Sequence, residues 1–164
     1  MLNLRSILFG LLIAFGPTGV SAQGANVNFG TFKADPTLPV EVTSDSLDVN
    51  QADGSAEFIG TVLVSQGEMR LSAQKVTVIY NQEVGGIDRL VATGEVILVN
   101  GPDAAEADRA EYTIDSGVIV MTGSVLLTQG PNALTSDRMT VNLTTGTANL
   151  VGRVKTIINP APKQ

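Results

Sequence analysis

The sequence predicts an all-β fold made of antiparallel strands, and three observations support this prediction. From Val40 onward, Val, Ile, Leu and Thr recur at every second position, as expected of strands with one buried face. Residues that tolerate positive φ separate these runs about every 10 to 15 residues, which suits a meander of antiparallel strands. A glycine-centred motif also repeats along the chain, and each repeat has room for a pair of strands and a tight turn.

Residues 1–22 have the pattern of a cleaved secretory signal peptide. Arg5 gives a short positive region, and an apolar stretch of nine residues follows from Ile7 to Phe15. The small residues of Val20-Ser21-Ala22 then predict cleavage after Ala22. The alternative is an uncleaved membrane anchor, but the apolar stretch is shorter than the roughly 20 residues that cross a bilayer.

The rest of the chain divides into a lead-in, one domain and a tail. Residues 23–38 contain Gly, Asn and Pro and predict a flexible lead-in, and residues 161–164 form a short tail. Residues 39–160 predict one β-domain, because the 142 residues left after cleavage (164 − 22) suffice for a single core. The chain has no cysteine, so this domain needs no disulfide for stability.

The repeated motif is centred on a glycine inside an extended run, with a valine two residues later. The glycines are Gly60, Gly94, Gly123 and Gly152. A glycine inside a strand packs nothing and is typical of a sharp bend or of a close backbone approach. Four of them at matching positions therefore predict a sheet folded along a line into a V-shaped, jelly-roll-like sandwich. An ordinary sandwich with a few poorly packing strand positions is the alternative.

Each of the first three repeats also carries a polar pair thirteen to fifteen residues after its glycine. These pairs lie within Ala73-Gln74-Lys75, Ala107-Asp108-Arg109 and Ser136-Asp137-Arg138, and Thr43-Ser44-Asp45 looks like the remnant of an earlier unit. Such pairs on neighbouring strands could form a cross-strand charge ladder, worth about 0.2–1 kcal/mol per pair. We expect the pairs to be structural rather than ligand-binding.

The composition excludes several kinds of active site. The chain has no histidine and no cysteine, so catalytic triads built on either residue are impossible. The carboxylates between Asp103 and Asp115 do not converge on one point, and a solvated strand face explains them better than a glycosidase pair does. Residues 48–54 (DVNQADG) depart from the ligand pattern of a calcium loop. We therefore expect no enzyme activity, no cofactor and no metal site.

The charge and the apolar content narrow the choice of partners. Cleavage leaves 9 basic and 16 acidic residues, a net charge of −7, which disfavours nucleic acid as a partner. Hydrophobic residues make up 43% of the chain and aromatic residues only 4%, so the interior is aliphatic. In a sheet that bends but need not close, such an interior could hold acyl chains, at roughly 0.8 kcal/mol per buried methylene. A dry hydrophobic core explains the same residues equally well.

The segment AEFIGTVLVSQGEMRLSAQKVTVIY, residues 56–80, resembles the OstA-like family of periplasmic lipopolysaccharide transport proteins. VTSDSLDV, residues 42–49, is similar to that family's first strand, and LVATGEVILVNG, VIVMTGSVLLTQG and NLVGRV continue the pattern. The resemblance covers residues 39–160 and implies an open, twisted β-jelly roll built from repeated antiparallel strand pairs. The acidic segment 103–111 departs from the family, which has a more apolar segment there, and so puts contact with cargo at this segment in doubt.

The resemblance also implies partners, a location and groove residues. It implies a periplasmic, non-catalytic protein that binds lipopolysaccharide, stacks on itself head to tail, and contacts the inner-membrane and outer-membrane components of the transport machinery. The stack would form an apolar groove that bridges the two membranes. The residues implied to line it are Val40, Val42, Phe58, Val62, Val64, Tyr112, Ile114, Met121, Val125 and Leu127. A register error of one residue would invert the facing of a strand.

Head-to-tail self-association requires strand edges that are free to pair with another copy. These edges would be the first strand, Val40–Val49, and the last strand, Ala148–Ile158.

Two alternative functions remain. An inner-membrane partner with the same fold would need a retained anchor, which the predicted cleavage site disfavours. A ligand-free structural β-repeat protein fits the repeat, but four irregular units in one secreted domain fit that class less well.

Overall fold

A computed structural model describes residues 25–28, 35, 37–52, 54–81, 83 and 85–159 of the chain. The strands are β1 (Ala25–Asn28), β2 (Glu41–Thr43), β3 (Ser46–Asn50), β4 (Ser55–Gln66), β5 (Met69–Asn81), β6 (Gly86–Asn100), β7 (Asp103–Thr113), β8 (Val118–Gln129), β9 (Asn132–Asn142), β10 (Thr147–Val151) and β11 (Lys155–Ile157). Among the described residues, no helix is long and apolar enough to cross a membrane.

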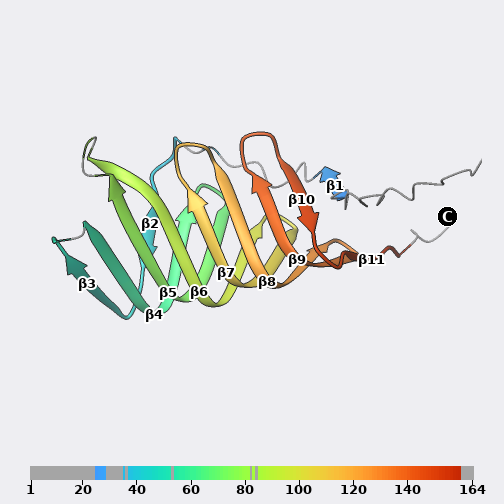
Figure 1. Ribbon diagram of the computed structural model, residues 1–164, viewed down its shortest axis with the longest axis horizontal. Coiled ribbons are helices and arrows are strands. Elements are labelled where there is room, and N and C mark those ends of the chain that lie inside the picture. Colours follow the sequence, from blue (N-terminus) through green and yellow to red (C-terminus); the bar gives the residue numbers. More distant parts are fainter. Residues whose placement is uncertain are drawn as a thin grey trace, which may run out of the picture.

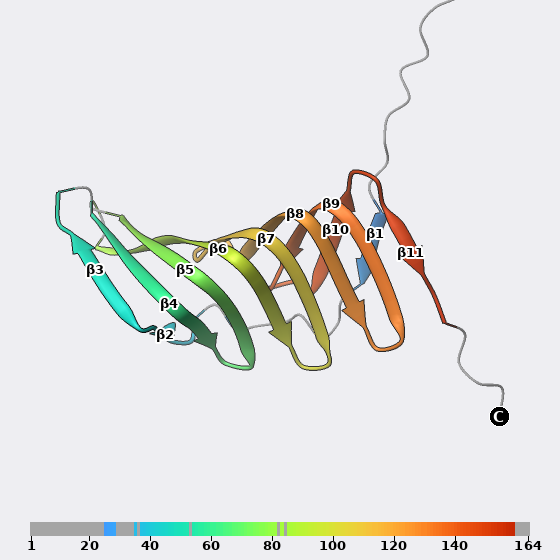
Figure 2. The same ribbon diagram turned by 90° about the horizontal axis from the view of Figure 1, so that it is seen from below.

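All eleven strands belong to one antiparallel sheet. Its order is β1-β10-β9-β8-β7-β6-β5-β4-β2, with β3 also paired to β4 and β11 also paired to β9. From β4 to β10, neighbours in the sheet are neighbours in sequence, so this part is a meander (Figure 1). The strands follow one another along the long axis of the molecule, with β3 at one end and β11 at the other (Figure 2). The predicted all-β, open jelly roll is confirmed.

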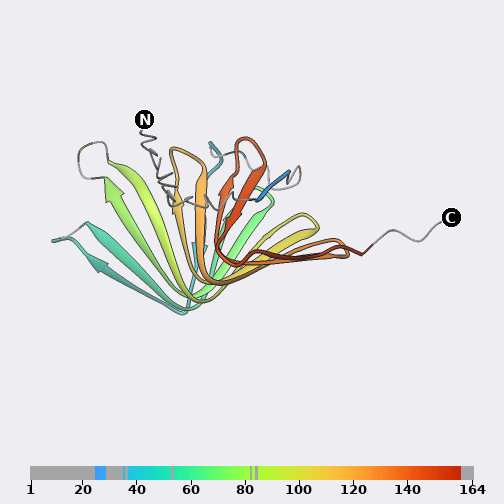
Figure 3. The same ribbon diagram turned by 45° about the vertical axis from the view of Figure 1, so that its right-hand side comes forward.

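The long strands bend where the sequence predicts a fold line. In β6, Gly94 has φ +79 and Glu95 has φ +49, so two successive residues adopt the left-handed conformation. These two residues lie opposite the single residue Asp108 of β7, because the register jumps between Thr93 and Val96. Such a β-bulge bends a strand and increases its twist. Equivalent shifts lie in β4 and β8, and together they fold the sheet into a V (Figure 3).

The fold line divides the sheet into two arms that pack on each other. Arm 1 comprises β2, β11 and residues 62–73, 96–107 and 125–136. Arm 2 comprises β1, β3, β10 and residues 55–59, 75–81, 86–93, 109–122 and 138–142. The hydrophobic core lies between the arms, and alternate residues of each strand point into it, as the period of two predicts.

The first and last strands differ from the prediction, because the fold line divides each of them. The predicted strand Val40–Val49 is two strands, β2 and β3, which pair with the two halves of β4 on either side of its bend. The predicted strand Ala148–Ile158 is likewise β10 and β11, separated at Gly152, where φ is +80. A bend in the neighbouring strand forces an edge strand to break, since one straight strand cannot follow both arms.

The lead-in predicted for residues 23–38 contains strand β1. It pairs with β10 in four consecutive positions, from Ala25 opposite Leu150 to Asn28 opposite Thr147. The predicted signal peptide, residues 1–22, and the predicted tail, residues 161–164, lie outside the described residues.

Candidate functional site

The ten residues expected to line a groove all lie in or against the interior between the arms. Six of them are buried members of the core: Val62, Val64, Tyr112, Met121, Val125 and Leu127. The other four are partly buried and pack against that core: Val40, Val42, Phe58 and Ile114. The structure therefore brings all ten into one continuous cluster. Their contact with a lipid stays a prediction.

The outer face of the same strands is distinct from this interior. Leu63 is 38% exposed, whereas Val62 beside it is 1% exposed. Ile59 is 36% exposed, whereas Phe58 packs against the core. Successive side chains of a strand point to opposite faces, so these neighbours separate the two faces of β4. The exposure of neighbouring residues therefore shows which side chains of β4 face the interior and which face outward.

The interior has more members than the sequence analysis named. Strand periodicity marks the other inward-facing residues equally well, but the family resemblance singled out only ten positions. The fully buried residues that it omitted include Met69, Leu98, Ile119, Met139, Leu143 and Leu150. The lining is thus mainly aliphatic, with methionines at Met69, Met121 and Met139, and methionine adapts readily to contacts of irregular shape.

One hydrogen-bonded chain joins the two arms across the interior. The Tyr112 hydroxyl of arm 2 donates to Gln66 Oε1 of arm 1 at 2.7 Å, and Gln66 Nε2 donates to the Leu38 carbonyl at 2.9 Å. Strands β7 and β4 are three steps apart in the sheet, about 14 Å at roughly 4.8 Å a step, so this bond crosses the interior. Tyr112 and Gln66 are each 1% exposed. We call these three residues the cross-arm clasp.

Burial sets the ionisation of the clasp tyrosine. It raises the pKa of the Tyr112 hydroxyl above its usual value, because the charged phenolate is disfavoured away from water. The hydroxyl is therefore a neutral donor at physiological pH. The sequence analysis included Tyr112 as an apolar lining residue and missed Gln66, because a polar residue before a glycine turn usually indicates an exposed loop.

Along the fold line, polar side chains of one strand lie over the glycines of the next. Asp45 covers Gly60 and accepts a hydrogen bond from the Thr61 amide at 2.8 Å. Asp108 covers Gly123 in the same way. Gln74 over Gly94 and Asp137 over Gly152 repeat the arrangement. The space above each glycine is thus filled by its neighbour's side chain, which explains why the motif pairs a glycine with Asp or Gln.

This arrangement replaces the predicted ladder between the polar pairs. The Asp and Gln members lie over glycines, while two of the basic members, Lys75 and Arg109, pair with glutamates. Lys75 forms an ion pair with Glu57 at 3.0 Å, and Arg109 forms one with Glu111 at 3.3 Å. The prediction that these residues are structural agrees with their contacts.

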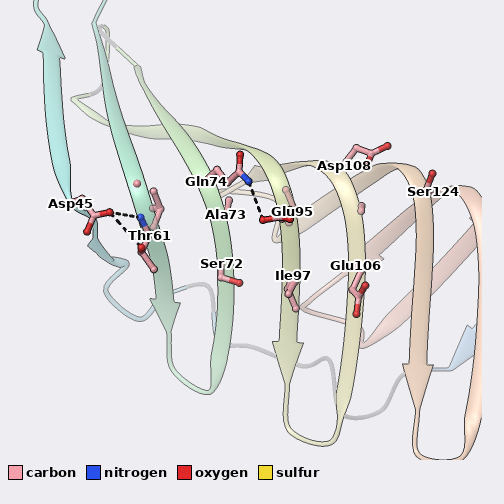
Figure 4. Close-up of a pocket in the computed structure, with 14 residues that line it drawn as sticks. Asp45, Thr61, Ser72, Ala73, Gln74, Glu95, Ile97, Glu106, Asp108 and Ser124 are labelled. Carbon is pink, nitrogen blue, oxygen red and sulfur yellow. Dashed lines mark hydrogen bonds between the residues drawn. The ribbon is translucent and has the colours of Figure 1, made fainter.

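The outer side of the fold line carries a shallow groove of about 870 Å³ (Figure 4). Four carboxylates line it, those of Asp45, Glu95, Glu106 and Asp108, and no Lys or Arg does. Phosphate groups would be repelled by such a lining. The groove is therefore a poor site for a phosphorylated headgroup. The apolar interior between the arms is the stronger candidate site for acyl chains. Within the described residues, no group of three or more acidic side chains could hold a metal ion.

The acidic segment 103–111 turns out to serve several structural roles. Asp103 is 1% exposed and accepts a hydrogen bond from Gln129 Nε2 at 3.2 Å. Glu111 pairs with Arg89 at 3.2 Å on the outer face. Glu106 is exposed in the outer groove. The buried positions of this segment are Asp103 and three alanines, Ala105, Ala107 and Ala110, so beyond Asp103 the segment presents small apolar side chains to the interior.

Comparisons with known proteins agree with this geometry. Residues 41–147 match the family described as LptA/(LptD N-terminal domain) LPS transport protein. An uncharacterised protein of Rhizobium meliloti (strain 1021) is 29% identical over 90 residues, which are 51% of this chain and 48% of that protein. The chain thus spans about half the length of this curated relative.

One solved structure is similar over most of the chain. It is the crystal structure of LptH from Pseudomonas aeruginosa, described as the LptA homologous periplasmic component of the conserved lipopolysaccharide transport device. The match has a TM-score of 0.69 and covers 77% of this chain and 99% of LptH, at 19% sequence identity. At this identity the likeness establishes the fold.

Proposed function

Because the chain belongs to the family of LptA and LptD N-terminal domain lipopolysaccharide transport proteins, we propose that it carries lipopolysaccharide across the periplasm by its acyl chains. The observation that carries this proposal is the aliphatic interior, which continues from β4 to β10. An acyl chain in such an interior gains roughly 0.8 kcal/mol per methylene removed from water. The family is one of transport proteins, so we propose no reaction.

Loading requires the two arms to move apart. Met121 and Leu127 have 0% exposed surface, so their contacts must be replaced when an acyl chain enters. The strand pairings run within each arm on either side of the fold line, and among the described strands none joins arm 1 to arm 2 across the interior. The arms can therefore open without breaking a ladder, although the cross-arm clasp must release or shift.

The ends of the sheet suit assembly of several copies into one longer interior. The edge strand β3 is exposed at all of its residues, including Leu47 at 50% and Val49 at 64%. At the other end, β11 exposes Ile157 at 51%. An exposed edge strand with apolar side chains is a template for pairing with another chain. We propose that copies stack head to tail and that the stack connects the inner-membrane and outer-membrane components of the machinery.

A photo-crosslinking pair on β4 tests where the cargo lies. A photoreactive phenylalanine analogue at Phe58 keeps the native ring, and the same analogue at Ile59 points to the outer face and serves as the matched control. In cells that make lipopolysaccharide, we expect adducts at position 58 and none at position 59. Adducts only at position 59 would move the cargo to the outer face. Absence of adducts at both positions in folded protein would contradict lipid carriage.

The periplasmic location rests on the predicted signal peptide and has its own test. N-terminal sequencing of the protein from expressing cells should begin at Gln23. Retention of residues 1–22 would instead support an anchored inner-membrane partner of the same pathway. Full function of the chain without any lipid adduct would support the ligand-free structural alternative.

A further inference from the structure

The two ends of arm 2 differ in whether the last strand of the meander has a further strand paired to its outer edge. At the N-terminal end, β3 has a free outer edge among the described strands, because it pairs with β4 and no other. At the C-terminal end, β10 pairs with β9 on one side and with β1 on the other. Strand β1 therefore covers the edge that a neighbouring copy would need in order to extend arm 2 (Figure 1).

The direction of β1 matches that of the strand a second copy would supply. Every pairing from β4 to β10 is antiparallel, so β4 and β10, six steps apart, run in the same direction. Strands β3 and β1 are each antiparallel to one of these two, so they also share one direction. A copy stacked end to end would place its own β3 antiparallel to β10, in the position and direction that β1 occupies.

The two strands are also similar in sequence. Strand β1 reads Ala25-Asn26-Val27-Asn28, and β3 ends Leu47-Asp48-Val49-Asn50. They share Val-Asn at the last two positions, and Asn stands where β3 has the similarly shaped Asp. Both strands alternate apolar and polar residues, which suits a place at the end of a half-buried sheet.

From these three observations we propose that β1 is an internal substitute for the β3 of a second copy. In a single chain it covers the edge of β10, and head-to-tail assembly displaces it. This inference rests on the head-to-tail assembly proposed above and adds the segment that controls it. Covering the edge within one chain also protects it from unspecific strand pairing before assembly.

A disulfide lock tests the proposal, because the native chain contains no cysteine. Asn26 and Asn149 are Cα partners, and facing residues of an antiparallel pair lie about 4.5–5.5 Å apart, a span that a disulfide bridges. The oxidised double variant Asn26→Cys/Asn149→Cys should stay monomeric at concentrations where its reduced form assembles. Sedimentation velocity over a concentration series measures this difference.

The matched control places the same lock at the other end of the sheet. Asp48 and Glu57 are Cα partners, so Asp48→Cys/Glu57→Cys ties β3 to the β4 that it already pairs with. Oxidation of this control should leave assembly unchanged, because the outer edge of β3 stays free. If both locks block assembly equally, an effect of the disulfide unrelated to β1 is the cause, and the proposal is wrong.

A second variant weakens β1 without a lock. Replacing residues 25–28 by Gly-Ser-Gly-Ser should lower the dissociation constant for self-association at least tenfold, since the competing strand is lost. An unchanged constant would overturn the proposal, and weaker association would show that β1 joins copies rather than separating them.

The crosslinking assay at Phe58 separates this inference from the proposed function. If lipopolysaccharide adducts form and the locked and unlocked proteins assemble alike, only the role of β1 is wrong. If no adducts form in any variant, lipid carriage is wrong whatever the effect of β1 on assembly.

Discussion

The inner face and the fold line of the sheet show two different ways of specifying structure. The inner face is made of interchangeable aliphatic side chains, such as Val62, Leu98 and Leu127, which are buried because strands alternate. The fold line instead depends on individual pairs, in which Asp or Gln of one strand lies over a glycine of the next. Stability should therefore respond to volume on the inner face and to backbone conformation at the fold line.

This difference bears on how a carrier of flexible lipid can also keep its shape. An interior of adaptable aliphatic and methionine side chains can exchange its contacts for those of an acyl chain. The bulges at Gly94-Glu95 and Gly123-Ser124 hold left-handed residues at fixed places, so they set the line about which the arms can move. The fold line thus fixes where the sheet bends, while the interior can accept different apolar contacts.

The largest effect should come from removing volume from the inner face. Leu127→Ala should destabilise the fold by about 2–5 kcal/mol, because the fully buried side chain leaves a cavity between the arms. Leu126→Ala is the matched control, since Leu126 is only partly buried and points to the other face. Leu126→Ala should lower the free energy of unfolding by at most half as much as Leu127→Ala does. Equal costs in urea denaturation would contradict the separation of the two faces.

The second-largest effect should come from adding one methyl group at the fold line. A Cβ at Gly94 would lie 2.8 Å from Gln74 Oε1 and 3.0 Å from Gln74 Cβ, and φ there is +79. Gly94→Ala should therefore cost about 1–3 kcal/mol. Gly86→Ala, where a Cβ meets nothing within 4 Å, is the control and should be neutral or slightly stabilising. Similar results for both variants in urea denaturation would show that the bend needs no glycine.

The cross-arm clasp should contribute less than the bend. Tyr112→Phe removes the buried hydrogen bond to Gln66 Oε1, at a cost of about 1–2 kcal/mol at neutral pH. Because the pKa of Tyr112 is raised by burial, its contribution is complete below pH 10 or so and is lost as pH rises toward the folded-state pKa. The Phe variant should lose less stability than the native chain in this alkaline range.

The control for the clasp is Tyr80→Phe, because Tyr80 is 43% exposed. This change should leave the free energy of unfolding at neutral pH unaltered. Faster uptake of a fluorescent acyl-chain probe by Tyr112→Phe than by Tyr80→Phe would sharpen the comparison, since it would show that the clasp restrains the opening of the arms. Equal rates would mean that the clasp does not restrain loading.

The smallest effect belongs to the ion pair at the last bend. The Arg153 guanidinium, which hydrogen-bonds to Asp137 at 2.6 Å, lowers the pKa of that carboxyl. Its stabilising contribution is therefore present above a pH near 4 and is lost as pH falls through the lowered pKa. Asp137→Asn should lower stability at pH 7 slightly and should reduce the loss of stability below pH 4 by the same small amount. An equal acid loss in both proteins would show that the pair contributes nothing.

The sequence by itself determined the fold class and the fold line, and it divided the residues of each strand between two faces. Alternation in runs such as Leu90, Ala92, Val96 and Leu98 follows from the period of two in a strand, and the structure buries this face. Periodicity alone does not say which face is buried, so the facing came from the family resemblance. The repeated glycines likewise marked the bends, since a strand interior rarely tolerates residues without side chains. These are local properties of the chain, and they need no information on which strands meet.

Only the tertiary structure decided which distant residues meet. The bond from Tyr112 to Gln66 and the place of β1 on β10 both join segments far apart in sequence. Each depends on strand register and on how the arms pack, and many pairings satisfy the same local patterns. A polar residue such as Gln66 looks like part of an exposed turn until the arms close over it. Local sequence therefore sets the strands, whereas packing selects their partners.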